Sequence, residues 1–582
     1  MAKIGLSERA RVAAVRTRGL RRMAASRILN SGLLQWRGGT DVLRALEIVP
    51  PVLRSRDPSF WAECESGYFG LAGHVAHLNS RSPFDIVAPG PLFERELHGF
   101  AWLRHLEATG DVAAQKVARD WVLHWMRSRR DRVGISAEPA VRARRILSLL
   151  AHAPFLLDGA EPGDFDALGR GLSREISSLT RSWREAIEGR QRLLALTALA
   201  AANLVMSGRQ RQLDGTLRAL GLEIDRQILG DGGHVSRNPA VIMGLLLDWL
   251  PLKSCFDALN RQPPEAFLAA IPRMLTMLRV LKLGDGAIAR FNGIGVSDSA
   301  ELATLAAYDD RPLPDWGIAP ISRYARLEAG SSIVVVDAGP PPPLMMSGDA
   351  HAGCLSFEMS ARHKLLFVNT GAPAAANGDW RAIARATASH STACLGEQSS
   401  ARLVRHSGLE RLLGAVPLQD PANVTAGLTA GDDGFIFEGS HDGYLARLGL
   451  IHHRHLRLNA QGTILAGIER LETKGGQGRL KRDVPFAVHF HLHPDTLATR
   501  TSRSGIEAIT IALSDGQEWR FEAAGAALGI DESCSFAGHA GPRPAVQIVA
   551  RGACAGVTEI RWSATLTHDP FARPVDFMRN PK

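Results

Sequence analysis

A polar segment between two apolar stretches carries the first side chains that could do chemistry. Residues 230–250 read GDGGHVSRNPAVIMGLLLDWL. The Gly-Gly pair favours a turn, and Asn238 before Pro239 is typical of a helix N-terminus that an asparagine side chain caps. The free N–H groups of such a terminus can hold a carboxylate. His234, Arg237 and Asn238 are therefore candidates for a site that binds an acidic substrate, and a plain helix cap is the alternative interpretation.

A second group of candidates follows in residues 347–360, SGDAHAGCLSFEMS. Asp349 and His351 are two positions apart, so the alternation of a strand would place both on one face. Asn369 and His390 follow in LLFVNTG and RATASHST. Two imidazoles with a side-chain oxygen suit a transition metal, most plausibly zinc. These ligands would come from different strands, so their spacing alone does not define a site.

Histidines also recur in three short segments: SHDGY (440–444), IHHRHLRL (451–458) and VHFHLHP (488–494). His489, His491 and His493 alternate, which predicts that they face one side of one strand. Three residues in a row on one strand do not easily surround a single metal ion. The pattern therefore favours a polar sheet face that lines a groove.

The elements that would position these residues differ between the two parts of the chain. Before about residue 325, apolar residues recur at the i, i+3, i+4, i+7 spacing of helices that bury one face. Eight segments show this pattern: 91–108, 113–128, 140–157, 165–187, 190–206, 212–229, 240–253 and 264–282. Short polar turns between them predict antiparallel helix pairs in a domain over residues 56–320. Residues 1–55 form an Arg-rich extension, whose helix is better suited to solvent or docking than to a membrane surface.

After residue 325 the apolar pattern shortens and alternates. Runs such as SSIVVVDAG, FAVHFHLHP and IEAITIALSDGQEWRFEAA are typical of strands, and Gly, Asp, Asn and Pro separate them. Many such strands in series predict an antiparallel β-sandwich over residues 325–582. The proline run in DAGPPPPLMM (337–346) predicts a loop, because proline is excluded from a strand interior.

The composition narrows the classes of partner. The 582 residues include 68 Lys and Arg against 59 Asp and Glu, a net charge of +9, which favours polyanionic partners. No basic stretch interleaved with aromatic residues predicts nucleic-acid binding. The six cysteines are scattered without a C-x-x-C pair, which argues against a zinc ribbon or a disulfide framework. No apolar run predicts a transmembrane segment, and the N-terminus lacks the apolar region of a secretory signal.

Five segments in order resemble the heparinase II/III superfamily, which includes heparin, heparan and alginate lyases. They are PLFERELHGFAWLRHL, DGGHVSRNP, DAHAGCLSFEMS, RATASHST and SHDGYLARLGLIHHRHLRL. The resemblance runs from about residue 90 to the C-terminus. It implies an incomplete (α/α) toroid followed by an antiparallel β-sandwich of supersandwich size, with a substrate cleft between them.

The resemblance also implies β-elimination on a uronate-containing glycan. That reaction needs the carboxylate neutralised, a base for the C5 proton and an acid for the leaving oxygen. If the chain is a lyase, the candidate catalytic residues are His234, Arg237, Asn238 and Asp349; Arg237 and Asn238 would neutralise the carboxylate, and His234 or Asp349 would be the base. The implied substrate contacts are His98, His441, Tyr444 and Arg454. The implied metal is a structural zinc held by His351, Asn369 and His390, with no organic cofactor.

This chain departs from the family pattern where the lyases keep their acid and base. The replacements are Val241 for the family tyrosine, Ile242 for the neighbouring histidine, Ser236 for a glutamate, Asp349 for the first histidine of H-x-H, and Gly189, Arg190 and Gln191 for Gly-Asn-His. Valine cannot move a proton, so the acid/base set of a lyase would be rewired here. The chain has four tyrosines, Tyr68, Tyr308, Tyr324 and Tyr444, and the sequence does not place any of them in the cleft. The candidates for the rewired set are His234, Arg237, Asn238, Asp349 and His351.

Two functions therefore stay open. One is a lyase-like enzyme for an acidic polysaccharide or oligosaccharide, and the other is a non-catalytic glycan-binding or envelope-assembly protein on the same scaffold. A metal-dependent hydrolase is a third and weaker option. The resemblance implies the cell envelope or periplasm, whereas the N-terminus fits a cytoplasmic protein. A homodimer is consistent with the sequence.

Overall fold

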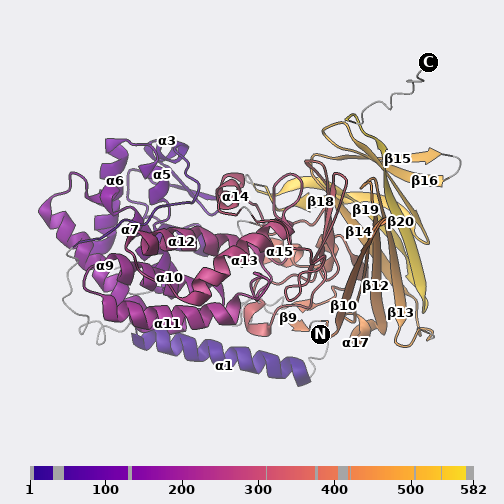
Figure 1. The fold of residues 1–582 in the computed structure, drawn as a ribbon, viewed down its shortest axis with the longest axis horizontal. Helices are drawn as coiled ribbons and strands as arrows, with labels where there is room; N and C mark the ends of the chain where they lie inside the picture. Colours follow the sequence, from indigo (N-terminus) through magenta and orange to yellow (C-terminus); the bar gives the residue numbers. More distant parts are fainter. Residues whose placement is uncertain are drawn as a thin grey trace, which may run out of the picture.

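The computed structural model describes residues 6–29, 45–128, 134–309, 311–373, 378–403, 417–419, 421–476, 478–503, 506–538 and 541–571. Helices build the first part and two large sheets build the second, side by side along the long axis of the molecule (Figure 1). The change between them falls between α14 (Ser299–Ala306) and β3 (Tyr324–Ala329).

The helices follow the predicted segments closely. They are α1 (Leu6–Leu29), α3 (Ser59–Glu65), α4 (Pro91–Gly99), α5 (Leu103–Glu107), α6 (Val112–Arg127), α7 (Pro139–Ala151), α8 (Ala153–Leu157), α9 (Pro162–Ser182), α10 (Arg190–Val205), α11 (Gln210–Gln227), α12 (Pro239–Ala258), α13 (Glu265–Leu281) and α14. Two predicted helices are divided: one at Phe100, in the left-handed region, and one at His152. A small hairpin, β1 (Tyr68–Leu71) with β2 (His74–His77), was not expected.

Helix α10 lies at the centre of the helical part. Every residue from Leu193 to Val205 is buried, and α7, α11 and α12 pack around it. Helix α12 has the length and apolarity of a membrane span, but 78% of its most apolar window is buried inside the protein. A helix that is apolar on all sides is satisfied in this way by the core of a large domain.

The strands form two eight-stranded antiparallel sheets. The first has the order β18-β19-β14-β6-β5-β4-β3, with β7 also paired to β14, and the second has the order β10-β11-β12-β13-β20-β17-β16-β15. The bounds of the first are β3, β4 (Ser332–Asp337), β5 (Phe357–Ala361), β6 (Lys364–Val368), β7 (Ala393–Leu395), β14 (Val484–Leu492), β18 (Ala527–Ser535) and β19 (Arg543–Cys554). Those of the second are β10 (Val424–Gly431), β11 (Gly434–His441), β12 (Leu450–Asn459), β13 (Ile464–Thr473), β15 (Leu497–Arg503), β16 (Ile506–Ala512), β17 (Glu518–Ala524) and β20 (Thr558–His568). Short β8 (Arg402–Leu403) pairs with β9 (Pro417–Gln419).

Two apolar cores hold these layers together. Phe357, Phe490, Phe521 and Trp562 fill the space between the two sheets, and the ring centroids of Phe490 and Phe521 are 4.8 Å apart. The first sheet also contributes Val335, Leu365 and Val368 to the apolar cluster of the helices. The helical part and the first sheet therefore share one continuous core.

Helix α1 runs along one side of the helical part (Figure 1). It packs against α9 and β9, buries Val15, and places Arg18 in an ion pair with Glu188. The basic helix of the N-terminal extension is thus a helix that docks on its own chain, at least over residues 6–29.

Two local expectations about strands are wrong. Asp349 and His351 do not lie on a strand, because residues 347–356 form a loop that precedes β5. The glycines and the alanines of GDAHAG provide little of the side-chain packing that stabilises strands. His493 lies just past the end of β14, so only His489 and His491 share that strand. The predicted loop after Asp337 is confirmed; it contains one turn of 3-10 helix, Leu344–Met346.

Candidate functional site

The junction between α12 and the loop before β5 brings the first two groups of predicted residues together. Asn238 caps α12: its Oδ1 accepts from the N–H of Ala240 at 2.9 Å, which confirms the predicted cap. Its Nδ2 donates to Oδ2 of Asp349 at 3.4 Å. Arg381 of α15 (Gly378–Ala384) lies 3.3 Å from the other oxygen of Asp349, whose side chain is 56% exposed. Asp349 is thus the predicted base that water reaches.

Close backbone contact makes this junction possible. Gly293 has a φ of +98°. A Cβ at Gly293 would lie 2.8 Å from Cβ of Asp349 and 3.0 Å from Nδ2 of Asn238. A side chain there would separate the two residues, so the glycine is required by both its backbone angle and the space.

Arg237 lies behind this junction, with its guanidinium enclosed by protein. Its Nη2 is 2.5 Å from Oδ1 of Asp337, and its Nε donates to the carbonyl oxygen of Ser322 at 3.0 Å. Nη1 donates to the carbonyl oxygens of Gly339 and Pro340 at 3.2 and 3.1 Å. The guanidinium of Arg237 is therefore occupied by groups of the chain itself and is not available to a substrate carboxylate.

Tyr324, which the sequence left unplaced, lies beside Arg237. The Arg237 guanidinium is 4.7 Å from the centroid of the Tyr324 ring, and the phenol donates to the carbonyl oxygen of Arg237. Asn292 Nδ2 donates to the phenol at 3.2 Å and to Asp337 at 3.0 Å. Tyr324 is 2% exposed, and burial raises its pKa. Asn292 and Asp337 were missed as partners because no sequence pattern links them to residue 237.

His234 is buried, and both of its ring nitrogens are occupied. Nδ1 lies 2.7 Å from Oγ of Ser236, and Nε2 lies 2.9 Å from Oε1 of Gln227. Burial and the nearby Arg190 lower the pKa of His234 to about 3. The imidazole is therefore neutral at pH 7, and its surroundings hold it in place. Val241 and Ile242, at the family's tyrosine and histidine positions, are buried apolar residues of α12.

His351 and His390 meet, but Asn369 does not complete a metal site with them. Nδ1 of His351 lies 3.0 Å from Nε2 of His390. Asn369 Oδ1 accepts from the N–H of Ser391 at 2.9 Å, and its Nδ2 donates to the carbonyl oxygen of Arg290 at 3.4 Å. Among the described residues, no group of three His, Cys, Asp or Glu side chains could hold a metal ion. The described residues offer zinc two ligands where a structural site uses four, so we derive no step through a metal.

The predicted substrate contacts lie in the interior. His441 is 3.2 Å from His452, which contacts Glu469 at 2.7 Å, and Arg454 pairs with the same carboxylate at 2.8 Å. All of these side chains are buried, and so is Tyr444, whose phenol donates to the carbonyl oxygen of Ala393 at 2.9 Å. They form a polar network inside the sandwich rather than a surface for a glycan.

His98, His489 and His491 are also buried. His98 lies in the helical core, where it accepts from Nε1 of Trp125 at 2.9 Å and stacks on Phe84. His489 and His491 stack with their centroids 6.0 Å apart and contact Gln547 and Ser533. Neither the helical core around His98 nor strand β14 therefore presents an exposed histidine ring to a groove.

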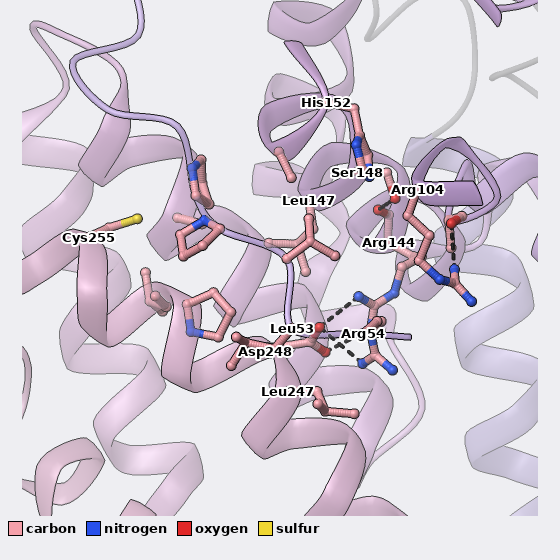
Figure 2. Close-up of a pocket in the computed structure, with 18 residues that line it drawn as sticks. Leu53, Arg54, Arg104, Arg144, Leu147, Ser148, His152, Leu247, Asp248 and Cys255 are labelled. Carbon is pink, nitrogen blue, oxygen red and sulfur yellow. Dashed lines mark hydrogen bonds and ion pairs between the residues drawn. The ribbon is translucent and has the colours of Figure 1, made fainter. Parts of the chain in front are cut away.

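A cluster of arginines in the helical part was missed by sequence reasoning. Arg144 pairs with Asp248 through two 2.7 Å contacts, and Arg54 reaches the same carboxylate at 3.1 Å (Figure 2). Although burial raises it, these two guanidinium groups hold the pKa of Asp248 below its usual range. Together with Arg104, they line a recess between α7, α12 and the segment 50–54. A fourth cation, Arg190, approaches the same turn of α12 at Gly244.

The comparisons with known proteins agree with this architecture. A family model described as heparinase II/III-like, C-terminal, matches residues 311–563. Heparinase III has a similar structure, with a TM-score of 0.65 and 11% identity, over 84% of this chain and 79% of its own. The heparan sulfate lyase HepC from Pedobacter heparinus has a TM-score of 0.56 and 14% identity, over 96% of this chain and 88% of its own. The chain belongs to the heparinase II/III superfamily.

A relative that matches about three quarters of the chain gives a different indication of role. FtsZ-localized protein C from Caulobacter vibrioides (strain NA1000 / CB15N) is 31% identical over 459 residues, which are 77% of this chain and 77% of that protein. Its name describes a location and no lyase activity. The lyase structures, at their low identity, show the fold alone.

Proposed function

We propose that this protein binds an acidic glycan without cleaving it, and that it acts in envelope assembly at the sites where FtsZ gathers. The observation that carries the first part is the enclosure of the proton-transferring groups. His234 and Tyr324 have no free position for a substrate proton, and Arg237 is neutralised by Asp337. β-Elimination needs a base and an acid within hydrogen-bond reach of the sugar.

Asp349 is the group that would have to supply this chemistry alone. It is exposed and contacts Asn238 and Arg381, and this one carboxyl group would have to serve both as the base at C5 and as the acid for the leaving oxygen. The junction offers one base and no partner acid among the residues placed there. The scaffold of a polysaccharide lyase therefore supports binding better than turnover.

The location is proposed from the relative. FtsZ-localized protein C shares most of this chain's length and carries FtsZ in its name. We infer that this protein also associates with FtsZ assemblies at the cell envelope. Neither the glycan binding nor the location needs zinc at His351 and His390.

The first test measures turnover and binding on the same preparation. Uronate polymers are incubated with the protein while ultraviolet absorbance reports the unsaturated product, and calorimetry reports binding. We expect binding without a rise in absorbance. A steady rise that disappears in Asp349→Asn would show a lyase with a rewired base and would refute the absence of cleavage.

The second test addresses the partner. Caulobacter FtsZ is polymerised with GTP and sedimented in the presence of the protein. We expect the protein in the pellet when GTP is present and in the supernatant when GDP replaces it. Equal distribution in the two nucleotide states would argue against an association with FtsZ assemblies. Metal analysis of the same preparation would show whether His351 and His390 hold zinc after all.

A further inference from the structure

Strand β10 forms one edge of the second sheet, and within the described residues its partner strand is β11 (Figure 1). The hairpin between them has a two-residue turn, Asp432–Asp433, so the flanking Gly431 and Gly434 form a hydrogen-bonded pair. Hydrogen bonding alternates along an antiparallel strand. Every second residue of β10 therefore directs its N–H and C=O groups away from the sheet: Val424, Ala426, Leu428 and Ala430.

This outward row of backbone groups is largely unpaired. Within the part of the chain that the structure describes, none of its N–H groups has a hydrogen-bond acceptor. One of its carbonyl oxygens, that of Ala426, accepts from Nη2 of Arg323 at 2.9 Å, which agrees with a row that points away from β11. A carbonyl oxygen has two lone pairs, so Ala426 can still accept a backbone N–H.

The other edges of the two sheets are protected in ways that β10 is not. Strand β15 carries Arg500 and Arg503, and β18 carries Asp531 and Glu532. Strand β3 is bridged by Ile318 and packs against α13. Charges and covering segments are ordinary means by which a sheet edge avoids pairing with a further strand. The eight residues of β10, VTAGLTAG, contain no charge and no proline, and their register with β11 is unbroken.

Exposed apolar side chains adjoin this edge. A Cβ at Gly317 would lie 2.6 Å from Cδ2 of Leu428, so the segment before β3 touches β10. Trp316, the preceding residue, is 39% exposed, and Leu313 is 40% exposed. A partner that pairs with the edge would therefore also cover apolar surface.

The outward row is complementary to itself. When two copies of β10 run antiparallel about a two-fold axis at Gly427, Val424 lies opposite Ala430 of the partner subunit, and Ala426 lies opposite Leu428 of the partner subunit. Each such pair exchanges two backbone hydrogen bonds, which gives about eight bonds across the axis. A shift of the register by two residues leaves one outward residue of each copy without a counterpart in β10.

We propose that β10 is a homodimer interface, at which it pairs antiparallel with β10 of a second copy of this chain. A two-fold dimer requires a patch that is complementary to itself, and the outward row meets this condition. The strand adds no like charges across the axis, although each copy has a net charge of +9. The second sheets of the two copies become one continuous sheet. This interface does not depend on the proposed glycan binding.

The first experiment tests the register through a covalent link. A Cβ at Gly427 or at Gly431 would meet nothing within 4 Å, so a cysteine fits at either position. Gly427 faces itself across the axis in a non-hydrogen-bonded pair, with Cα atoms about 4.5 Å apart, which is within the range of a disulfide. The two copies of Gly431 lie on the order of 25 Å apart. In oxidised glutathione, we expect Gly427→Cys to form linked dimers at least about tenfold faster than Gly431→Cys on non-reducing gels.

The second experiment measures affinity by sedimentation equilibrium of the full chain. A single strand pair is a small interface, so we expect a Kd on the order of 10–100 µM. Thr425 lies opposite Thr429 of the partner subunit. Lysine at both positions should therefore weaken the dimer about tenfold, whereas Thr425→Lys with Thr429→Glu should restore at least the wild-type affinity. Thr499→Lys on β15 is the matched control and should change the Kd less than about twofold.

The outcomes separate this interface from other modes of association. A wild type that stays monomeric at about 500 µM would overturn the proposal. Equal rates of disulfide formation at Gly427→Cys and Gly431→Cys would refute the register. A dimer that both double variants leave unchanged would show that another surface pairs. Circular dichroism melts of all variants confirm that a lost dimer is not a lost fold.

Discussion

Water reaches the two ion pairs beside α12 to very different extents. Arg237 and Asp337 are both buried, whereas Asp349 opposite Arg381 is more than half exposed. Removing one partner of a buried pair leaves the other charge in a poor environment, which costs about 3–5 kcal/mol. Exposed pairs contribute about 0–1 kcal/mol.

We therefore expect Asp337→Ala to lower the free energy of unfolding by about 3–5 kcal/mol and Asp349→Ala by less than about 1 kcal/mol. Urea denaturation followed by tryptophan fluorescence measures both. Equal losses in the two variants would show that Asp337 is not the essential partner of Arg237.

His234 makes the stability depend on pH with a defined sign. Its pKa is about 3 in the folded chain and about 6.5 in an unfolded one. Between these values the unfolded state binds more protons, so stability falls as the pH is lowered below about 6.5. The slope from this residue is at most about 1.4 kcal/mol per pH unit.

We expect His234→Gln to flatten the fall in unfolding free energy between about pH 6.5 and 5 by close to that slope. Urea denaturation at a series of pH values gives the measurement, and exposed His77→Gln is the matched control. An unchanged slope in His234→Gln would mean that the imidazole is protonated in the folded protein.

At the scale of elements, the residue that begins α12 stabilises the helix, and this role can be measured separately from glycan binding. Asn238 caps the helix through Oδ1, while its Nδ2 contacts Asp349. We expect Asn238→Ala to lower the unfolding free energy by about 1 kcal/mol and Asn238→Asp to retain the cap. Asn238→Asp places a carboxylate beside Asp349 and should weaken binding of an acidic glycan. Thermal melts and calorimetry separate the two effects; equal destabilisation by both variants would refute the cap.

The sequence predicted elements better than contacts. The helical period located nearly all helices of residues 91–282, because each buries one face along its own segment. The alternation of apolar residues indicated the sandwich for the same reason. Asp349 was wrongly assigned to a strand, because two residues at a spacing of two fit a loop equally well.

The candidate site was less predictable than the fold. Whether His234 is a base or a buried hydrogen-bonding group depends on Gln227, which lies on the helix before it. Tyr324 and Asp337 reach Arg237 from strands about ninety residues or more along the chain. Contacts between residues this far apart in the chain are determined by tertiary packing, and they leave no local pattern in the sequence.

At the scale of the whole molecule, the shared core predicts joint unfolding. Val335, Leu365 and Val368 of the first sheet are packed into the helical cluster, so losing either part would expose apolar surface on the other. We expect differential scanning calorimetry of the intact chain to show one main transition. Two well-separated transitions, with the helical signal lost first in circular dichroism, would show that the parts are stable on their own.

The continuous core also has a kinetic consequence for ligands. Asp349 and Asn238 belong to different parts of the fold, yet both parts are fixed to the same apolar interior. The two sides of the junction cannot swing open like the halves of a hinge without exposing that interior to water. A sugar chain would bind to a preformed surface, and no closing step would follow its binding. Residence time would then depend on the contacts at the junction itself, so a single exchanged side chain could retune the protein for a new glycan while the architecture stays unchanged.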